Sequence, residues 1–145
     1  QGRYCFRTVS CEHVNVAIDN CLSPKLARAL AELFKDQHIV EHLRQKFGDG
    51  VADLTWIDAL NKEGRWIVIS GDRRITKVRA EYAAFRSSRL IGFFLSKGLY
   101  KTSTVRQMER ILALWPGLEK LAGTVEGGAM FELPGTSTRI KQLKD

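Results

Sequence analysis

Short apolar runs alternate with segments of helical periodicity along the whole chain. The runs at 66–69 and 90–95 are almost continuously apolar, without the polar alternation of a half-exposed strand. Strands buried on both faces are typical of parallel sheets whose connecting helices cover each side. The pattern predicts an α/β fold with three layers, α/β/α, around a mainly parallel sheet. In such sheets ligands bind beyond the carboxyl ends of the strands, so the residues that follow each strand are the candidates for function.

The expected elements follow from this periodicity and from local start and stop signals. Ser23 and Pro24 are typical of a helix N-cap and of a first helical residue, and Asp53 opens a second helix that Gly64 closes. We expect strands at 14–18, 38–43, 66–69, 90–95 and 129–133. We expect helices over 24–34, over 53–63, from Ile75 to Phe85, from about 103 to Pro116, and over 138–143 as a short tail. In the third of these helices, we expect Val78 on the buried stripe.

Length and composition bound the class of protein. The chain has 145 residues, 44% hydrophobic and 27% charged, which excludes a mainly disordered state and fits one domain, expected over 14–145. Residues 1–13 are expected to be an extension that is vector-derived or partly disordered. The longest apolar run, 90–95, is too short to span a membrane, and the N-terminal residues lack the apolar stretch of a signal peptide. We therefore expect a cytoplasmic protein that does not engage a membrane.

Three cysteines make an odd count, which argues against a disulfide framework and favours a reducing compartment. A zinc site could be drawn from Cys5, Cys11, His13 and Cys21, but the spacing contains no close Cys-x-x-Cys pair. The sequence thus disfavours structural zinc.

The charge of the chain is unevenly distributed. The net charge is +7, yet residues 1–72 carry 9 basic and 10 acidic side chains, whereas residues 73–145 carry 14 and 6. A protein would show this division if it used carboxylates of its first half for chemistry and basic residues of its second half to bind a polyanion. Chance unevenness in a short chain would also produce it.

Two carboxylates stand where a parallel sheet presents its ligands, and a third begins a helix nearby in the sequence. Asp19 and Asp72 each follow a predicted strand, and Asp53 begins the helix that leads into the second of these strands. Whether Asp53 faces the other two depends on the loop over 44–52, which the sequence does not fix. Right-handed crossovers bring both strand ends to one edge of the sheet. Carboxylates gathered there repel one another unless a cation intervenes, and Mg²⁺ or Mn²⁺ is the usual one. Each residue also has an ordinary structural interpretation: a helix cap for Asp53 and Asp72, and a turn for Asp19.

Three segments in order resemble the PIN-like nuclease domains, specifically the VapC-type toxin-like branch. They are Ile18-Asp19-Asn20-Cys21-Leu22-Ser23-Pro24-Lys25-Leu26-Ala27, Asp53-Leu54-Thr55-Trp56-Ile57 and Trp66-Ile67-Val68-Ile69-Ser70-Gly71-Asp72. Each motif is weak singly, but their order and spacing are specific. The resemblance implies a PIN-like fold and a metal-dependent endoribonuclease, most often the toxin of a toxin–antitoxin pair.

The resemblance also implies roles for individual residues. Asp19, Asp53 and Asp72 match the catalytic, metal-binding acids of the family, with Mg²⁺ or Mn²⁺ as the cofactor. Asn20 and Ser70 match positions that support the site. The family usually has another carboxylate at this site. No clear motif marks it in this sequence, and Glu41 and Asp49 are the two candidates.

Basic residues after the third and fourth strands are candidates to hold the phosphate backbone of RNA. They are Arg73, Arg74, Lys77, Lys97 and Lys101. A solvated helix face is the alternative interpretation of this pattern, and it is the better one for Arg79. The expected partners are the RNA substrate, an antitoxin protein and a second copy in a homodimer. The late amphipathic helix could serve either protein partner or simply pack in the core.

Two other functions remain open at this level. A PIN-like module without activity, binding RNA or protein, fits the missing family carboxylate. A receiver-like signalling domain shares the alternating order and has a lysine after a late strand, Lys97, but Asp19-Asn20 lacks the acidic pair it needs.

Overall fold

The computed structural model describes residues 13–144. Its centre is a six-stranded sheet of order β3-β2-β4-β5-β6-β7. The four pairings from β3 to β6 are parallel, and β6 pairs with β7 in the antiparallel direction. The strands are β2 (Asn15–Ile18), β3 (Ile39–His42), β4 (Trp66–Ser70), β5 (Ile91–Leu95), β6 (Met130–Leu133) and β7 (Lys141–Leu143).

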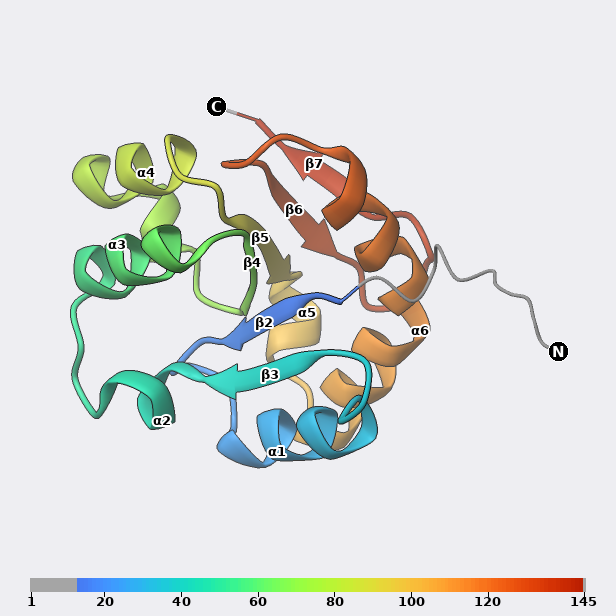
Figure 1. Ribbon diagram of the computed structural model, residues 1–145. Coiled ribbons are helices and arrows are strands. Elements are labelled where there is room, and N and C mark those ends of the chain that lie inside the picture. Colours follow the sequence, from blue (N-terminus) through green and yellow to red (C-terminus); the bar gives the residue numbers. More distant parts are fainter. Residues whose placement is uncertain (1–12, 145) are drawn as a thin grey trace, which may run out of the picture.

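Helices cover both faces of this sheet, so the predicted three-layer α/β/α architecture with a mainly parallel sheet is confirmed (Figure 1). One face carries α1 (Pro24–Leu33), α5 (Lys97–Tyr100) and α6 (Thr104–Thr124). The other face carries α2 (Leu43–Phe47), α3 (Asp53–Glu63) and α4 (Arg79–Arg86), with the 3-10 helix η2 (Arg73–Thr76) beside them.

The two core layers arise from the two-residue period of the strands. In β2, Val16 and Ile18 pack in the core under α1 and α6, whereas Ala17 between them packs under α3. All five residues of β4 and of β5 are buried. Each large aliphatic side chain hidden in this way contributes about 1.5–3 kcal/mol. The uninterrupted apolar runs thus make a sheet with no solvated face at its centre.

The predicted helix starts are confirmed at α1 and α3. Ser23 caps α1, because its Oγ accepts the backbone N–H of Lys25 at 3.1 Å, and Pro24 occupies the first turn. Helix α3 begins at Asp53, and Gly64 with φ 141° ends it. That φ lies in the region that glycine adopts without the steric cost of a Cβ.

The helix predicted from Ile75 to Phe85 is wrong as one element. A 3-10 turn over Arg73–Thr76 and the separate helix α4 take its place, and Val78 between them is extended at φ −94° and ψ 114°. The Asp72 side chain starts the 3-10 turn by accepting the backbone N–H of Arg74. Consequently Val78 points outward with 44% of its surface exposed, not into the predicted stripe.

Two predictions for the C-terminal part are also wrong. Helix α6 continues through Pro116 to Thr124, since the buried Leu118 and Ala122 extend its apolar face and outweigh the one backbone hydrogen bond that proline removes. The predicted tail helix over 138–143 is absent from the described residues. Instead, Lys141–Leu143 forms β7, which satisfies the backbone groups along the edge of β6.

Within residues 13–144, no helix is both long and apolar enough to cross a membrane.

Candidate functional site

The carboxyl ends of β2 and β4 lie side by side and are joined by one buried serine. Ile18 pairs with Ile69, and the backbone N–H of Asp19 continues the ladder to the Ile69 carbonyl at 2.9 Å. The Ser70 hydroxyl donates to Asp19 Oδ2 at 2.7 Å and accepts the backbone N–H of Asp72 at 3.1 Å. Ser70 therefore fixes the Asp19 carboxylate relative to the segment that carries Asp72.

Asp53 reaches the same region from α3. The N-cap of this helix is Ala52, without a side-chain hydrogen bond, so the capping interpretation of Asp53 is wrong. Its carboxylate instead accepts the indole N–H of Trp56 at 2.9 Å. Trp56 is fully buried in the core under α3, which fixes the direction in which Asp53 points.

The Asp72 carboxylate caps the 3-10 turn that follows it and also lines a cavity. Its Oδ1 accepts the backbone N–H of Arg74 at 2.9 Å, so it caps the 3-10 turn. Its Oδ2 accepts the Arg74 guanidinium Nε–H at 2.5 Å, and the residue lines a cavity.

That cavity brings the predicted acids together. It has a volume of about 350 Å³ and lies at the carboxyl edge of the sheet. Its walls come from the ends of β2 and β4, from the loop before α3 and from η2. The lining residues are Asp19, Asn20, Cys21, Gly50, Val51, Asp53, Asp72, Arg74 and Ile75.

The electrostatics of the cavity are unfavourable for ionised carboxylates. Burial raises the pKa of Asp19, hydrogen bonds from Ser70 and from the Asn20 backbone oppose that rise, and the charges of Asp53 and Asp72 add to it. Asp19 is only 8% exposed. Among the described residues, Arg74 alone ion-pairs with any of the three aspartates, which leaves two negative charges unpaired.

The donor set fits a hard divalent cation, although the side chains are not arranged around one. Within residues 13–144, no three His, Cys, Asp or Glu side chains are placed so that they could hold a metal ion as they stand. Arg74 holds Asp72, and Trp56 holds Asp53. Carboxylate oxygens are nevertheless the preferred ligands of Mg²⁺ and Mn²⁺. The amide oxygen of Asn20 is buried without a hydrogen-bond partner, which supplies a further oxygen donor beside Asp19.

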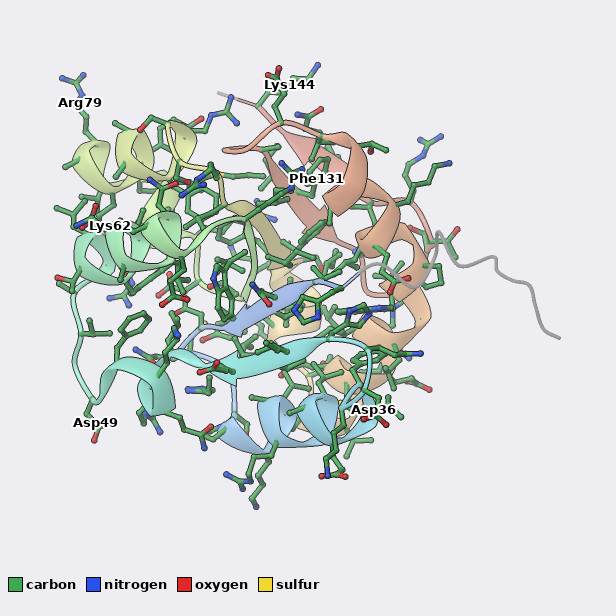
Figure 2. The ribbon with its side chains drawn as sticks, in the orientation of Figure 1. Asp36, Asp49, Lys62, Arg79, Phe131 and Lys144 are labelled. Carbon is green, nitrogen blue, oxygen red and sulfur yellow. The ribbon has the colours of Figure 1, made fainter. Side chains whose placement is uncertain are left out.

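The two candidates for a further carboxylate lie elsewhere. Glu41 is 4.0 Å from Lys46, and Asp49 pairs with Arg44 at 3.1 Å. Asp49 projects from the loop beyond α2 (Figure 2) with 85% of its side chain exposed. Neither lines the cavity.

An acid that the sequence reasoning missed lies nearer. Glu81, in the first turn of α4, approaches Asp53 closely enough for their carboxyl groups to share a hydrogen bond when one is protonated. Burial raises the pKa of Glu81, and the charge of Asp53 raises it further. No motif pointed to Glu81, because its position depends on the packing of α4 against α3.

The predicted basic residues have different surroundings. Arg74 lines the cavity, and Arg73 pairs with Glu132 at 2.8 Å. The three lysines, Lys77, Lys97 and Lys101, are exposed, and no ion pair within residues 13–144 involves them.

Cys21 also lines the cavity, and it was not predicted as a site residue. Its Sγ accepts the backbone N–H of Gly71 at 3.3 Å and lies 3.5 Å from Ser70 Oγ. Burial raises the pKa of the thiol, and the charge of Asp19 adds to the effect. Cys21 thus remains a neutral thiol that ties the two loops together. Of the other residues in the disfavoured zinc group, Cys5 and Cys11 lie outside the described residues, and His13 hydrogen-bonds to Asn15.

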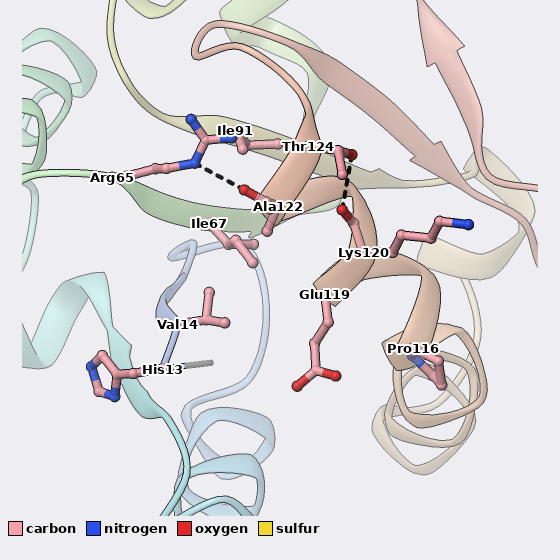
Figure 3. A pocket seen from close by; sticks show the side chains of 11 residues that line it. His13, Val14, Arg65, Ile67, Ile91, Pro116, Glu119, Lys120, Ala122 and Thr124 are labelled. Carbon is pink, nitrogen blue, oxygen red and sulfur yellow. Dashed lines mark hydrogen bonds between the residues drawn. The ribbon is translucent and has the colours of Figure 1, made fainter. Parts of the chain in front are cut away.

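A larger cavity of about 890 Å³ lies at the opposite edge of the sheet, between the amino ends of β4 and β5 and the C-terminal half of α6 (Figure 3). Arg65, in its wall, donates to the Ala122 carbonyl at 2.9 Å. Among residues 13–144, the one carboxylate that lines it is Glu119, which contacts His38 Nε2 at 2.7 Å. The described part of its wall therefore does not gather the unpaired carboxylates found in the acidic cavity.

A comparison with known protein families gave a match. A family model described as a PIN-like domain matches residues 14–97, which include all three aspartates. The chain belongs to the PIN-like domain family. No curated protein and no solved structure gave a significant match. The PIN-like family has a nuclease-type fold, and its three-layer architecture is the one observed.

The ion pair between Arg74 and Asp72 leads to a first prediction. Any cation that enters the cavity competes with the guanidinium for Asp72 Oδ2. The Arg74 side chain is 79% exposed, and exposed ion pairs contribute at most about 1 kcal/mol. Replacing Arg74→Gln should therefore tighten Mn²⁺ binding by up to about fivefold, measured by titration calorimetry.

The matched control is Arg79→Gln, because Arg79 loses the same charge but points outward from α4 (Figure 2). It should leave the Mn²⁺ affinity unchanged. Weaker Mn²⁺ binding by the Arg74→Gln variant than by the unaltered chain would contradict competition between Arg74 and the cation.

Proposed function

We propose that this PIN-like domain is a metal-dependent endoribonuclease that hydrolyses RNA phosphodiesters at the cavity formed by Asp19, Asp53 and Asp72. The observation that carries the proposal is the charge of this cavity: three carboxylates, one of them buried, face a single guanidinium. Two unpaired negative charges in a partly buried site favour the binding of one divalent cation.

Asp19, Asp53 and Asp72 would hold Mg²⁺ or Mn²⁺, as PIN domains typically do, with Ser70 and Asn20 as supports. When bound, the ion lowers the pKa of a water molecule and stabilises charge on the phosphate. Ser70 keeps Asp19 oriented by its 2.7 Å hydrogen bond, and the indole N–H of Trp56 does the same for Asp53. Products with a 5′-phosphate and a 3′-hydroxyl are expected.

RNA is the proposed substrate because of the charge outside the cavity. The half of the chain after Asp72 contains 14 basic and 6 acidic residues, and Lys97 and Lys101 follow the strand next to β4. Unpaired lysines near an acidic centre can hold phosphates while the metal acts on one of them. A VapC-type toxin acting in the cytoplasm, with an antitoxin and a second copy as partners, is the narrower form of the proposal.

The test is cleavage of a labelled single-stranded RNA by the purified chain. Cleavage is expected with Mg²⁺ or Mn²⁺, and an excess of EDTA should abolish it. Expression of the chain should arrest growth if it is a toxin, and the Asp72→Asn variant should not. RNA binding without cleavage in any divalent ion would overturn the nuclease proposal and favour the inactive RNA-binding module.

A further inference from the structure

Tyr100 carries a partly exposed aromatic ring that contacts residues beside the acidic cavity, and none of the roles described so far uses it. It ends the short helix α5, and 36% of its surface is exposed. Its hydroxyl donates to the Cys21 carbonyl at 3.5 Å, and Cys21 lines the cavity. The ring thus extends from the end of β5 across to the loop that carries Asp19.

The ring rests on Gly71, between Ser70 and Asp72. A Cβ added at Gly71 would lie 2.1 Å from Tyr100 Cδ1 and 2.6 Å from Cε1, so only glycine allows this contact. The backbone of Tyr100 is held as well: the buried side-chain amide of Gln107 donates to its carbonyl at 3.0 Å. The ring is therefore fixed in place beside the loop of Asp72.

Two lysines flank Tyr100 in the sequence. Lys97 precedes Tyr100 by one helical turn and Lys101 follows it directly, and both lysines are exposed. No ion pair among the described residues involves either of them. An aromatic ring with unpaired basic residues next to it in the chain is a combination with which proteins bind single-stranded nucleic acids, the ring stacking on a base and the cations pairing with phosphates.

We infer that Tyr100 stacks against one unpaired base of the RNA, next to the phosphate that enters the acidic cavity. This inference rests on the proposed function and adds to it a residue, Tyr100, that positions the RNA at the cavity. Stacking reads no base edge, so any base is accepted at this position. Lys97 and Lys101 hold the phosphates on either side, and a duplex is disfavoured because its bases are not free to stack on the ring.

The experiment measures the binding of an RNA series in which each oligonucleotide lacks one base at a different position. The full chain carries Asp72→Asn to prevent cleavage. At one position, loss of the base should weaken binding by about 5-fold to about 150-fold. Replacing Tyr100→Leu should remove this penalty while intact RNA binds more weakly. Tyr100→Phe, which keeps the ring, should retain the penalty.

A purely structural role for Tyr100 would weaken the binding of every oligonucleotide equally and would overturn the inference. The absence of any position sensitive to base loss in the chain that keeps Tyr100 would also overturn it, even if Tyr100→Leu does not fold. The unaltered chain is assayed in parallel for cleavage. If the RNA is cleaved but no position is sensitive to base loss, only the role of Tyr100 is rejected. If the RNA is neither bound nor cleaved, the proposed function is rejected as well.

Discussion

Replacing Asp19→Asn should lower the rate of RNA cleavage in Mg²⁺ at least ~100-fold, equivalent to about 2.7 kcal/mol of transition-state stabilisation. The amide keeps the size of the side chain and can still accept the hydroxyl hydrogen of Ser70. It loses the charge that a divalent cation requires. The rate is measured in single-turnover assays with a labelled single-stranded RNA. A rate within threefold of that of the unaltered chain would contradict the proposed role of Asp19.

The same substitution should stabilise the metal-free fold at neutral pH. Because the pKa of Asp19 is raised above 3.8 on folding, the folded state holds its proton more tightly than the unfolded state does. The stability that this group contributes is therefore full below about pH 4 and is lost as the pH rises through the folded pKa. Urea unfolding at pH 7 in EDTA should show a gain for Asp19→Asn, and the gain should vanish near pH 4.

The matched control is Asp58→Asn on α3. Asp58 is exposed and pairs with Lys62 at 3.0 Å on the helix surface. The Asp58→Asn variant loses the same charge at a residue that does not line the cavity. The cleavage rate of this variant should stay within a factor of two of the unaltered chain, and its stability at pH 7 should not rise.

Reversing both lysines beside Tyr100, with Lys97→Glu and Lys101→Glu, should weaken RNA binding by on the order of 25-fold at 0.1 M salt. Each phosphate contact with a single strand contributes about 0.7 to the slope of log affinity against log salt, so two lost contacts reduce that slope by about 1.4. The measurement is a binding series from low to high salt on the Asp72→Asn background. An unchanged slope would mean that the lysines do not contact RNA.

The control for this pair changes the same charge elsewhere. Arg79 lies on α4, and Lys120 lies beside the larger cavity at the opposite edge of the sheet. The variant Arg79→Glu with Lys120→Glu should keep the salt slope of the unaltered chain. A loss equal to that of the lysine pair would indicate a general effect of net charge.

The sheet and the acidic edge could be predicted from the sequence, because they depend on local signals. Uninterrupted apolar runs located β4 and β5, and Ser23-Pro24 located the start of α1. The parallel topology then placed Asp19 and Asp72 at one edge. Asp53 is a candidate from its position at the start of α3, but its approach to the other two aspartates depends on the loop before α3, which has no periodic pattern.

The rest of the site depends on contacts between distant segments. Glu81 approaches Asp53 only because α4 packs on α3, and Tyr100 rests on Gly71 only because α5 follows the strand beside β4. The break at Val78 has a local origin instead, since the Asp72 side chain accepts the backbone N–H of Arg74 and starts a 3-10 turn before α4. Helical periodicity is unchanged by such a break and could not reveal it.

The most direct test of the acidic cavity as a metal centre is anomalous diffraction from crystals of the chain soaked in Mn²⁺. One peak is expected within about 2.5 Å of carboxylate oxygens from at least two of Asp19, Asp53 and Asp72, with the Arg74 guanidinium moved away from Asp72. Crystals of Asp19→Asn should lose the peak or show it at much lower occupancy. A soaked crystal of the active chain with Mn²⁺ bound elsewhere, and none in this cavity, would contradict the account.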